Sequence, residues 1–246
     1  MVETSVILDR IGATRSFDRS DLQVVMEECG HKTSRSIANH MLETLLATGD
    51  VARVGRNKYC VSGSLKTYNF PYSDLAVSLA DEIIKAHPYL DFRIFELVQL
   101  NEFVNHQIAH NIVFVSVERN LEDDVFNTLW ERHKGSILIK PKADELFRYL
   151  NEDMVVIMKL PTESPKGLNV FWNTRLEKML VDIAVDKLIR QVVYAGEYST
   201  IYKDSFSKYA IDRNMMFRYA RRRGVLEKYK EFLINEAGLK QEDLKL

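Results

Sequence analysis

Residues 20–61 read SDLQVVMEECGHKTSRSIANHMLETLLATGDVARVGRNKYCV, and this stretch decides the fold of the chain. Its first part has apolar residues at the i, i+3, i+4, i+7 spacing of one buried helix face: Leu22, Val25, Met26 and Cys29. Ser20 or Asp21 can cap the start of this helix, and Gly30 stops it. The pattern therefore predicts a short amphipathic helix followed by a polar turn.

A second helix is predicted after that turn. Thr33 or Ser34 offers a side-chain oxygen for its N-cap, and the helix runs to about Thr48 before Gly49. One side of its helical wheel is apolar and is expected to face the core: Ile37, Ala38, Met41, Leu42 and Leu45. The opposite side is polar and is the candidate reading face: Ser36, Asn39, His40 and Glu43.

A small basic hairpin follows the second helix. Residues 51–54 and 58–61 are rich in β-branched and aromatic residues and flank a turn at residues 55–57. Two helices followed by such a hairpin have the order of a winged helix-turn-helix, which usually docks on duplex DNA. Between residues 30 and 60 five cations outnumber two anions, with Lys32, Arg35, Arg53, Arg56 and Lys58 set against Glu43 and Asp50.

Each part of this module has an expected role at the DNA. Arg53, Arg56 and Lys58 would neutralise phosphates, whereas Ser36, Asn39 and His40 could reach base edges. The predicted DNA-binding set is completed by Ser34, Arg35 and Asn57. Two alternatives remain open at this point, namely a winged helix that contacts protein and a three-helix structural cap.

The overall composition excludes several classes of protein. The chain has 246 residues, is 46% hydrophobic and 28% charged, and has a net charge of −1, so it is not a general polycation and any DNA contact must come from a local patch. Cys29 and Cys60 fall on expected core positions. They are therefore predicted to be small apolar core residues rather than the two halves of a disulfide, which suits a reducing cytoplasm. Without an apolar run of ~20 residues or a basic-then-apolar leader, a cytoplasmic location without membrane contact is expected.

The middle of the chain predicts a second domain. A turn-rich stretch at residues 62–72 indicates a linker, so the expected domains are a DNA-binding domain at 1–66 and an α/β domain at 72–246. Four apolar runs predict strands at 92–97, 112–117, 137–140 and 155–160. Helical patterns at 74–86, 98–109, 121–133 and 143–150 alternate with them. This alternation is typical of an α/β domain whose mostly parallel sheet is covered on both faces.

The C-terminal part is predicted to be helical. Residues 174–177 have a capping-box pattern that opens a helix through about Gln191, and further helices are expected near 199–209, 214–223 and 225–237. Between residues 201 and 230 nine cations face three anions, and Arg218, Arg221, Arg222 and Arg223 form the expected partner surface. The competing interpretation is a solvated helix end whose cations complement the helix dipole.

Enzyme interpretations have weaker support. His106 and His110 lie one helical turn apart but lack the glutamate of a His-Glu-x-x-His site. Asp91, Glu96 and Glu118 at predicted strand ends could hold magnesium in a nuclease, although Glu118 is followed by Arg-Asn rather than by the expected lysine. Gly-rich phosphate loops, serine-hydrolase elbows and Cys-x-x-Cys pairs are missing. No catalytic residue, metal or cofactor is therefore expected, and a metal-dependent nuclease steered to DNA by the wing is the alternative.

Two blocks of sequence resemble the AbiEi-type antitoxins of abortive-infection, type IV toxin–antitoxin systems. One is the N-terminal module, with Gly-Asp-Val-Ala-Arg at 49–53 and Lys-Tyr at 58–59. The other comprises residues 174–182 (TRLEKMLVD), 209–212 (YAID) and 218–224 (RYARRRG). The resemblance implies a cytoplasmic bacterial protein of phage defence that represses its own operon. It also implies that the C-terminal domain, with Arg218 to Arg223 as its antitoxic surface, counters a nucleotidyltransferase-like toxin.

The expected partners follow from these interpretations. They are the double-stranded DNA of a promoter or operator and, through the resemblance, the cognate toxin. Winged helices often bind as dimers, so a homodimer stays open, but no heptad seam predicts one.

Overall fold

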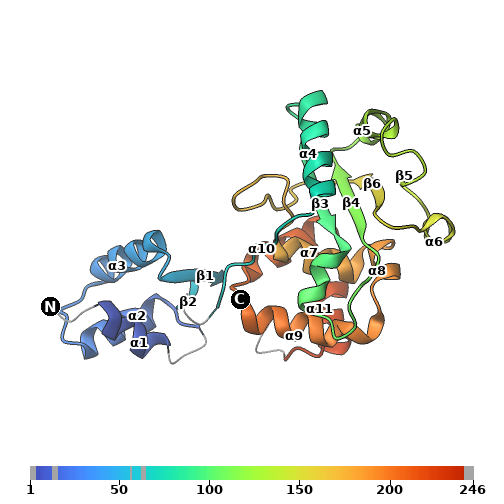
Figure 1. The fold of residues 1–246 in the computed structure, drawn as a ribbon. Helices are drawn as coiled ribbons and strands as arrows, with labels where there is room; N and C mark the ends of the chain where they lie inside the picture. Colours follow the sequence, from blue (N-terminus) through green and yellow to red (C-terminus); the bar gives the residue numbers. More distant parts are fainter. Residues whose placement is uncertain (1–3, 13–15, 56, 62–64, 241–246) are drawn as a thin grey trace. The chain divides into compact units, whose positions relative to one another are not determined.

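The computed structural model describes residues 4–12, 16–55, 57–61 and 65–240, which form two compact units (Figure 1). The first unit contains the described residues up to Tyr68 together with residues 204–216 and Lys240. The second contains residues 69–203 and 217–239. The sequence places the boundary between its two expected domains at residues 66–72 and assigns residues 204–216 to the second domain, whereas these residues cluster with the first unit.

Among its described residues up to Tyr68, the first unit contains three helices and a two-stranded antiparallel hairpin. These elements are α1 (Thr4–Gly12), α2 (Arg19–Glu28), α3 (Arg35–Thr48), β1 (Val51–Gly55) and β2 (Lys58–Val61). Their shared core contains Ile7 and Ile11 of α1, Leu22 and Met26 of α2, and Leu42 of α3. The two helices and the hairpin expected from the sequence are present, whereas α1 was not predicted.

Local side-chain caps determine where α2 and α3 begin. Asp18 is the N-cap of α2, and its carboxylate accepts hydrogen bonds from the backbone N–H groups of Ser20 and Asp21. Asp21 accepts one in return from the Asp18 N–H at 2.7 Å, which completes a capping box. The sequence predicts the cap at Ser20 or Asp21, which is two or three residues after the actual cap, Asp18. Ser34 caps α3 as predicted, and Gly49 ends it with a left-handed φ of +80°.

A distant part of the chain completes the first unit. The Lys66 N–H donates to the Lys208 carbonyl at 2.8 Å, and the Ala210 N–H donates to the Lys66 carbonyl at 2.9 Å. The rings of Tyr68 and Tyr209 meet edge to face, with 5.2 Å between their centroids. This bridge explains why residues 204–216 join the first unit, because their backbone and aromatic groups pair with residues just after the hairpin.

The second unit has a four-stranded sheet with helices before, between and after its strands. Its elements are α4 (Asp74–Ala86), β3 (Phe92–Glu96), the 3-10 helix η1 (Leu97–Glu102), β4 (Ile112–Val117), α5 (Glu122–Trp130), β5 (Ile137–Ile139), α6 (Ala143–Tyr149), β6 (Met154–Lys159), α7 (Leu176–Val185), α8 (Ile189–Val192), the 3-10 helix η2 (Ala195–Glu197) and α11 (Leu226–Asn235). It also contains the first part of α9 (Tyr198–Lys208) and the last part of α10 (Arg213–Arg222), whose remaining residues belong to the first unit. The strand order is β3-β4-β6-β5. Only β3 pairs antiparallel within this sheet, so the described strands form the mixed, mostly parallel sheet that was expected.

Alternate residues of the strands form the core against α4 and α5. Ile94 of β3, Val115 of β4 and Ile157 of β6 pack with Leu79 of α4 and Leu129 of α5. The intervening strand residues are buried too, as every residue of β3 and β4 is. Burial on both faces explains the continuous apolar runs that predicted these strands.

Two predicted elements of this unit are wrong. The helix expected at 98–109 is replaced by η1, which ends at Glu102 and is followed by irregular chain. The capping box at residues 174–177 does not form, because the Thr174 hydroxyl donates to the Ile94 carbonyl at 2.7 Å and Glu177 pairs with Arg175. The helix expected to reach Gln191 ends at Val185, and α8 follows as a separate element.

The two cysteines are buried and unpaired, as predicted. None of the helices in the described part of the chain has the length and apolar character needed to cross a bilayer.

Candidate nucleic-acid interface

The N-terminal half of α3 presents a polar surface to solvent. Arg35, Ser36 and His40 are exposed, whereas Ala38 and Leu42 on the other side of the helix are buried in the unit's core. Glu43 is also exposed, one turn farther along. Within the first unit, Arg35, Ser36 and His40 are therefore accessible on the surface that is predicted to face DNA.

Two α3 residues are placed differently from the prediction. Asn39, expected on the reading face, is half-buried, and its Oδ1 atom is buried without a hydrogen-bond partner among the described residues. Ile37, expected in the core, is 49% exposed. The buried stripe is narrower than the helical wheel suggested, since Ala38, Leu42 and Leu45 fill it. Ile37 therefore belongs to the exposed surface of α3, and Asn39 does not.

Ser34 serves α3 itself. Its hydroxyl oxygen accepts a hydrogen bond from the Ile37 N–H at 3.4 Å, so it caps the helix while its side chain stays at the surface. A Ser cap of this kind stabilises a helix by about 1 kcal/mol. If Ser34 contacts DNA as predicted, it must do so while it caps α3.

The hairpin carries its expected cations in different environments. Arg53 on β1 is exposed, and Asn57 lies at the turn with a left-handed φ of +52° and a half-buried side chain. Arg56, predicted to bind phosphate, lies outside the described residues. Among the described residues of the hairpin, Arg53 is consequently a more exposed cation than Lys58.

Lys58 is partly engaged within the unit. Its Nζ lies 3.6 Å from Oδ2 of Asp18, the cap of α2. Burial raises the pKa of the Asp18 carboxyl, but hydrogen bonds from the backbone N–H groups of Asp21 and Ser20 and the charge of Lys58 outweigh it and lower that pKa. This ion pair joins the hairpin to α2, so Lys58 has a structural role that the sequence did not reveal and is a weaker candidate for phosphate binding.

The C-terminal arginines differ in exposure. Arg218, Arg221 and Arg222 are exposed. Arg222 lies 3.1 Å from Glu163 and donates to the Thr162 hydroxyl. Arg223, which was predicted to be on the partner surface, is largely buried and pairs with Asp182 and Asp186. The partner-surface prediction therefore fails for Arg223.

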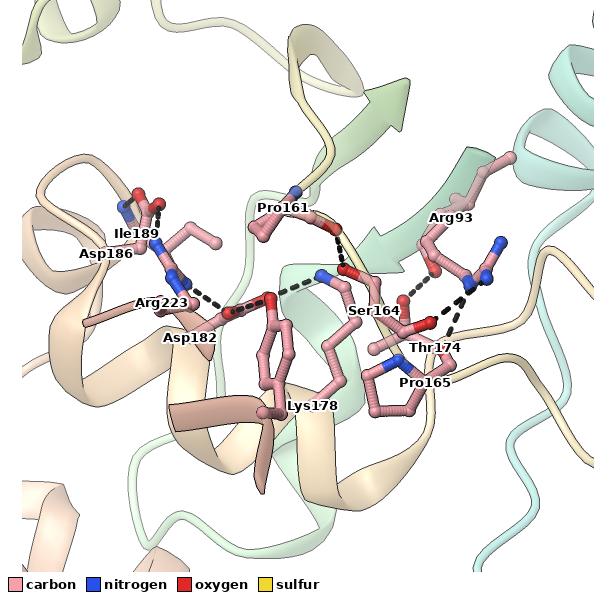
Figure 2. A network of polar contacts seen from close by, with 12 residues as sticks. Arg93, Pro161, Ser164, Pro165, Thr174, Lys178, Asp182, Asp186, Ile189 and Arg223 are labelled. Atoms are coloured by element: carbon pink, nitrogen blue, oxygen red, sulfur yellow. Dashed lines mark hydrogen bonds and ion pairs between the residues drawn. The ribbon is translucent and has the colours of Figure 1, made fainter. Parts of the chain in front are cut away.

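Arg223 belongs to an internal ionic network that joins α7 to α10 (Figure 2). Lys178 and Asp182 of α7 are almost fully buried and form an ion pair one helical turn apart. The Tyr219 hydroxyl donates to Asp182 at 2.9 Å, and Arg223 reaches Asp186 at 3.0 Å. Two cations thus balance two carboxylates. The residues at 174–182 and 218–224 that carry the antitoxin resemblance meet here and have a structural function.

Electrostatics favour the charged forms of Asp182 and Arg223. Burial raises the pKa of the Asp182 carboxyl, but the charges of Lys178 and Arg223 outweigh burial and hold the pKa below its ordinary range. Burial acts to lower the pKa of Arg223, and the neighbouring Asp182 charge raises it instead. Asp182 is stabilised in its charged form by Lys178, one turn earlier on α7, and by Arg223, which the fold brings from beyond the end of α10.

The carboxylates of the nuclease alternative are dispersed. Asp91 and Glu118 lie at the same end of the β3–β4 pair, where the Glu118 N–H donates to the Asp91 carbonyl. Glu96 lies at the other end of β3, about 16 Å away at the usual rise of a strand, and accepts hydrogen bonds from Ser73 and Asn111. Asp91 pairs with Arg93 at 2.8 Å. The three groups do not converge on one position.

The two histidines are also not a ligand pair on a helix. His106 lies in the irregular chain after η1, where its Nδ1 is 2.7 Å from the buried carboxylate of Glu197, and His110 is exposed. Among residues that the structure describes, no group of three or more His, Cys, Asp or Glu side chains could hold a metal ion.

The fold defines the class first: a mixed α/β protein with a small, mostly parallel sheet and helices at both ends of the chain. A family model described as "Family of unknown function (DUF6577)" matches residues 37–238, so the chain belongs to that family. No curated protein matches it. The structure described as "Crystal structure of RV2827C protein from Mycobacterium tuberculosis" is similar at 11% identity and a TM-score of 0.34, over 99% of this chain and 82% of that chain. A similarity of that size supports no argument about fold or function.

Proposed function

We propose that the chain is a DNA-binding transcriptional regulator whose first unit is a winged helix-turn-helix. The observation that carries the proposal is the solvent-exposed N-terminal half of α3, which bears Arg35, Ser36 and His40, together with the exposed Arg53 on the hairpin. Winged helix-turn-helix modules insert the N-terminal residues of the second helix of the motif into the major groove. Here that helix would be α3.

The proposed contacts divide into two kinds. Arg35 and Arg53 neutralise phosphates, which supplies affinity without reading sequence. Ser36 and His40, which share the exposed face of α3, hydrogen-bond base edges in the groove. The wing contributes mainly through Arg53, because Arg53 is exposed on β1 whereas Lys58 is half-buried.

The antitoxin resemblance refines this proposal. On that basis the protein is a cytoplasmic bacterial antitoxin of an abortive-infection system, without catalytic activity of its own, that represses its operon and counters a nucleotidyltransferase-like toxin. Its antitoxic surface is formed by the exposed Arg218, Arg221 and Arg222, without Arg223, which is committed to the ionic network.

A repression and rescue experiment tests both parts. The DNA upstream of the chain's own gene drives a reporter, and the adjacent gene is expressed as the candidate toxin. The full chain is expected to lower reporter output and to restore growth. Arg35→Ala with Arg53→Ala should relieve repression and keep rescue, since phosphate contacts are lost. Arg218→Ala with Arg221→Ala should keep repression and lose rescue.

The outcomes separate the two claims. Full repression by the Arg35/Arg53 double variant would contradict the proposed DNA interface. Growth rescue by the Arg218/Arg221 double variant at the wild-type level would contradict the proposed antitoxic surface. A wild-type chain that changes neither reporter nor growth would contradict the antitoxin function.

A further inference from the structure

Ile37 is an aliphatic side chain exposed where the proposed interface would meet the bases. It is 49% exposed, although the next residue, Ala38, is buried. Ser36 and His40, one position before it and three after it, are exposed with it. Ile37 therefore lies within the polar surface of α3 rather than in the core.

Ile37 lies in the first turn of α3. Its backbone N–H donates to the Ser34 cap at 3.4 Å, and its carbonyl lies inside the helix. A β-branched side chain in a helix has one strongly preferred rotamer. Its methyl groups consequently point in a defined direction, and little side-chain freedom is lost when they are covered.

The surroundings of Ile37 decide what can cover it. The exposed neighbours on this half of α3 are cationic or polar, and the next acidic residue along the helix is Glu43. This charge pattern fits a polyanionic partner, and duplex DNA offers one apolar group in its major groove, the C5-methyl group of thymine. Ser and His side chains nearby would bind the base edges around that methyl group.

We infer that Ile37 is a specificity-determining residue that packs on a thymine methyl group in the recognised site. The inference rests on the proposed DNA-binding function and adds one base preference to it. Removing a methyl group from an apolar contact lowers affinity about fourfold. A site with uracil at the contacted position should therefore bind about fourfold more weakly than the thymine site.

The test starts from the full chain and a pool of random-sequence DNA duplexes. The enriched sequence is made as a labelled duplex, and each thymine is replaced in turn by uracil. Anisotropy titrations with wild type and Ile37→Ala then form a double-mutant cycle. One uracil position is expected to weaken wild type about fourfold and to leave Ile37→Ala unchanged. Leu46→Ala, which alters another exposed aliphatic residue of α3, should keep the full uracil penalty.

The results distinguish the inference from the function beneath it. A wild-type chain that enriches no duplex overturns both. A chain that binds its site and tolerates uracil at every position overturns the role of Ile37 alone. A uracil penalty that persists in Ile37→Ala does the same, and Ile37→Val, which keeps the β-branch, should retain most of the penalty.

Discussion

Replacing Ser36 by glutamate is expected to weaken binding of the chain to its promoter duplex at least about 100-fold. Ser36 lies on the exposed face of α3 that we place in the major groove. A carboxylate there would approach phosphates and base acceptors, and like charges brought together at an interface cost several kcal/mol. A loss of about 2.7 kcal/mol already corresponds to 100-fold in affinity.

The same substitution should leave the fold intact. Ser36 is the second residue of α3 after its Ser34 cap, and α3 has no acidic residue in its first turn. Glutamate near a helix N-terminus is favourable because it complements the helix dipole. Thermal unfolding should therefore show an unchanged or slightly raised Tm, which separates lost binding from lost structure.

Ser36→Gln is the matched control, because it has the size of glutamate without the charge. Anisotropy titrations of a labelled promoter duplex should show a much smaller loss for glutamine than for glutamate. If Ser36→Glu binds within a few-fold of wild type, the N-terminal half of α3 is not at the DNA.

Replacing Asp182 by asparagine is expected to destabilise the second unit by about 3–5 kcal/mol. The substitution keeps the size of the side chain and removes the charge that faces Lys178 and Arg223, both largely buried. Removing one partner of a buried ion pair leaves an uncompensated charge, which has about that cost. Tryptophan fluorescence during urea unfolding measures the effect in the right unit, because Trp130 and Trp172 are the two tryptophans of the chain.

The chain offers a control for this effect. Glu227 and Lys230 of α11 also form an ion pair within one helix of the second unit, but both are substantially exposed. Glu227→Gln should change the urea midpoint little, since exposed pairs contribute about 0–1 kcal/mol. Equal midpoints for the two variants would contradict the energetic role of the network.

The network also predicts an acid dependence. The pKa of Asp182 is lowered in the folded protein, so the Asp182 carboxylate contributes stability above its unfolded pKa and loses that contribution as pH falls through its folded pKa. Wild type should therefore lose more stability than Asp182→Asn between neutral pH and acidic pH below the ordinary aspartate range. Parallel losses in the two proteins would contradict this assignment.

Short-range signals predicted much of the fold. The cap at Ser34, the left-handed Gly49 and the bounds of α4 follow from residues within a few positions of each helix end. The strands of the sheet followed from apolar runs, which arise because both faces of the sheet are buried. Such features depend on the local chain and need no knowledge of the tertiary structure.

Long-range pairing explains what the sequence did not reveal. Thr174 satisfies the carbonyl of Ile94 rather than capping α7, and Lys66 pairs with residues 208–210. The sequence alone predicts a surface position for Arg223, but the fold brings Asp182 and Asp186 beside it. For α1 the sequence does contain a helical signal, because Ile7 and Ile11 are four positions apart, and both are buried in the structure.

The most direct test of the account is the salt dependence of DNA binding. Anisotropy titrations of the promoter duplex at several salt concentrations give a slope that counts the phosphates neutralised, at about 0.9 per phosphate. For Arg35→Ala with Arg53→Ala we predict a slope shallower by about 1.8 and a weaker affinity, whereas Arg218→Ala with Arg221→Ala should keep the wild-type slope. An unchanged slope and affinity in the Arg35/Arg53 double variant would contradict the claim that the first unit binds DNA.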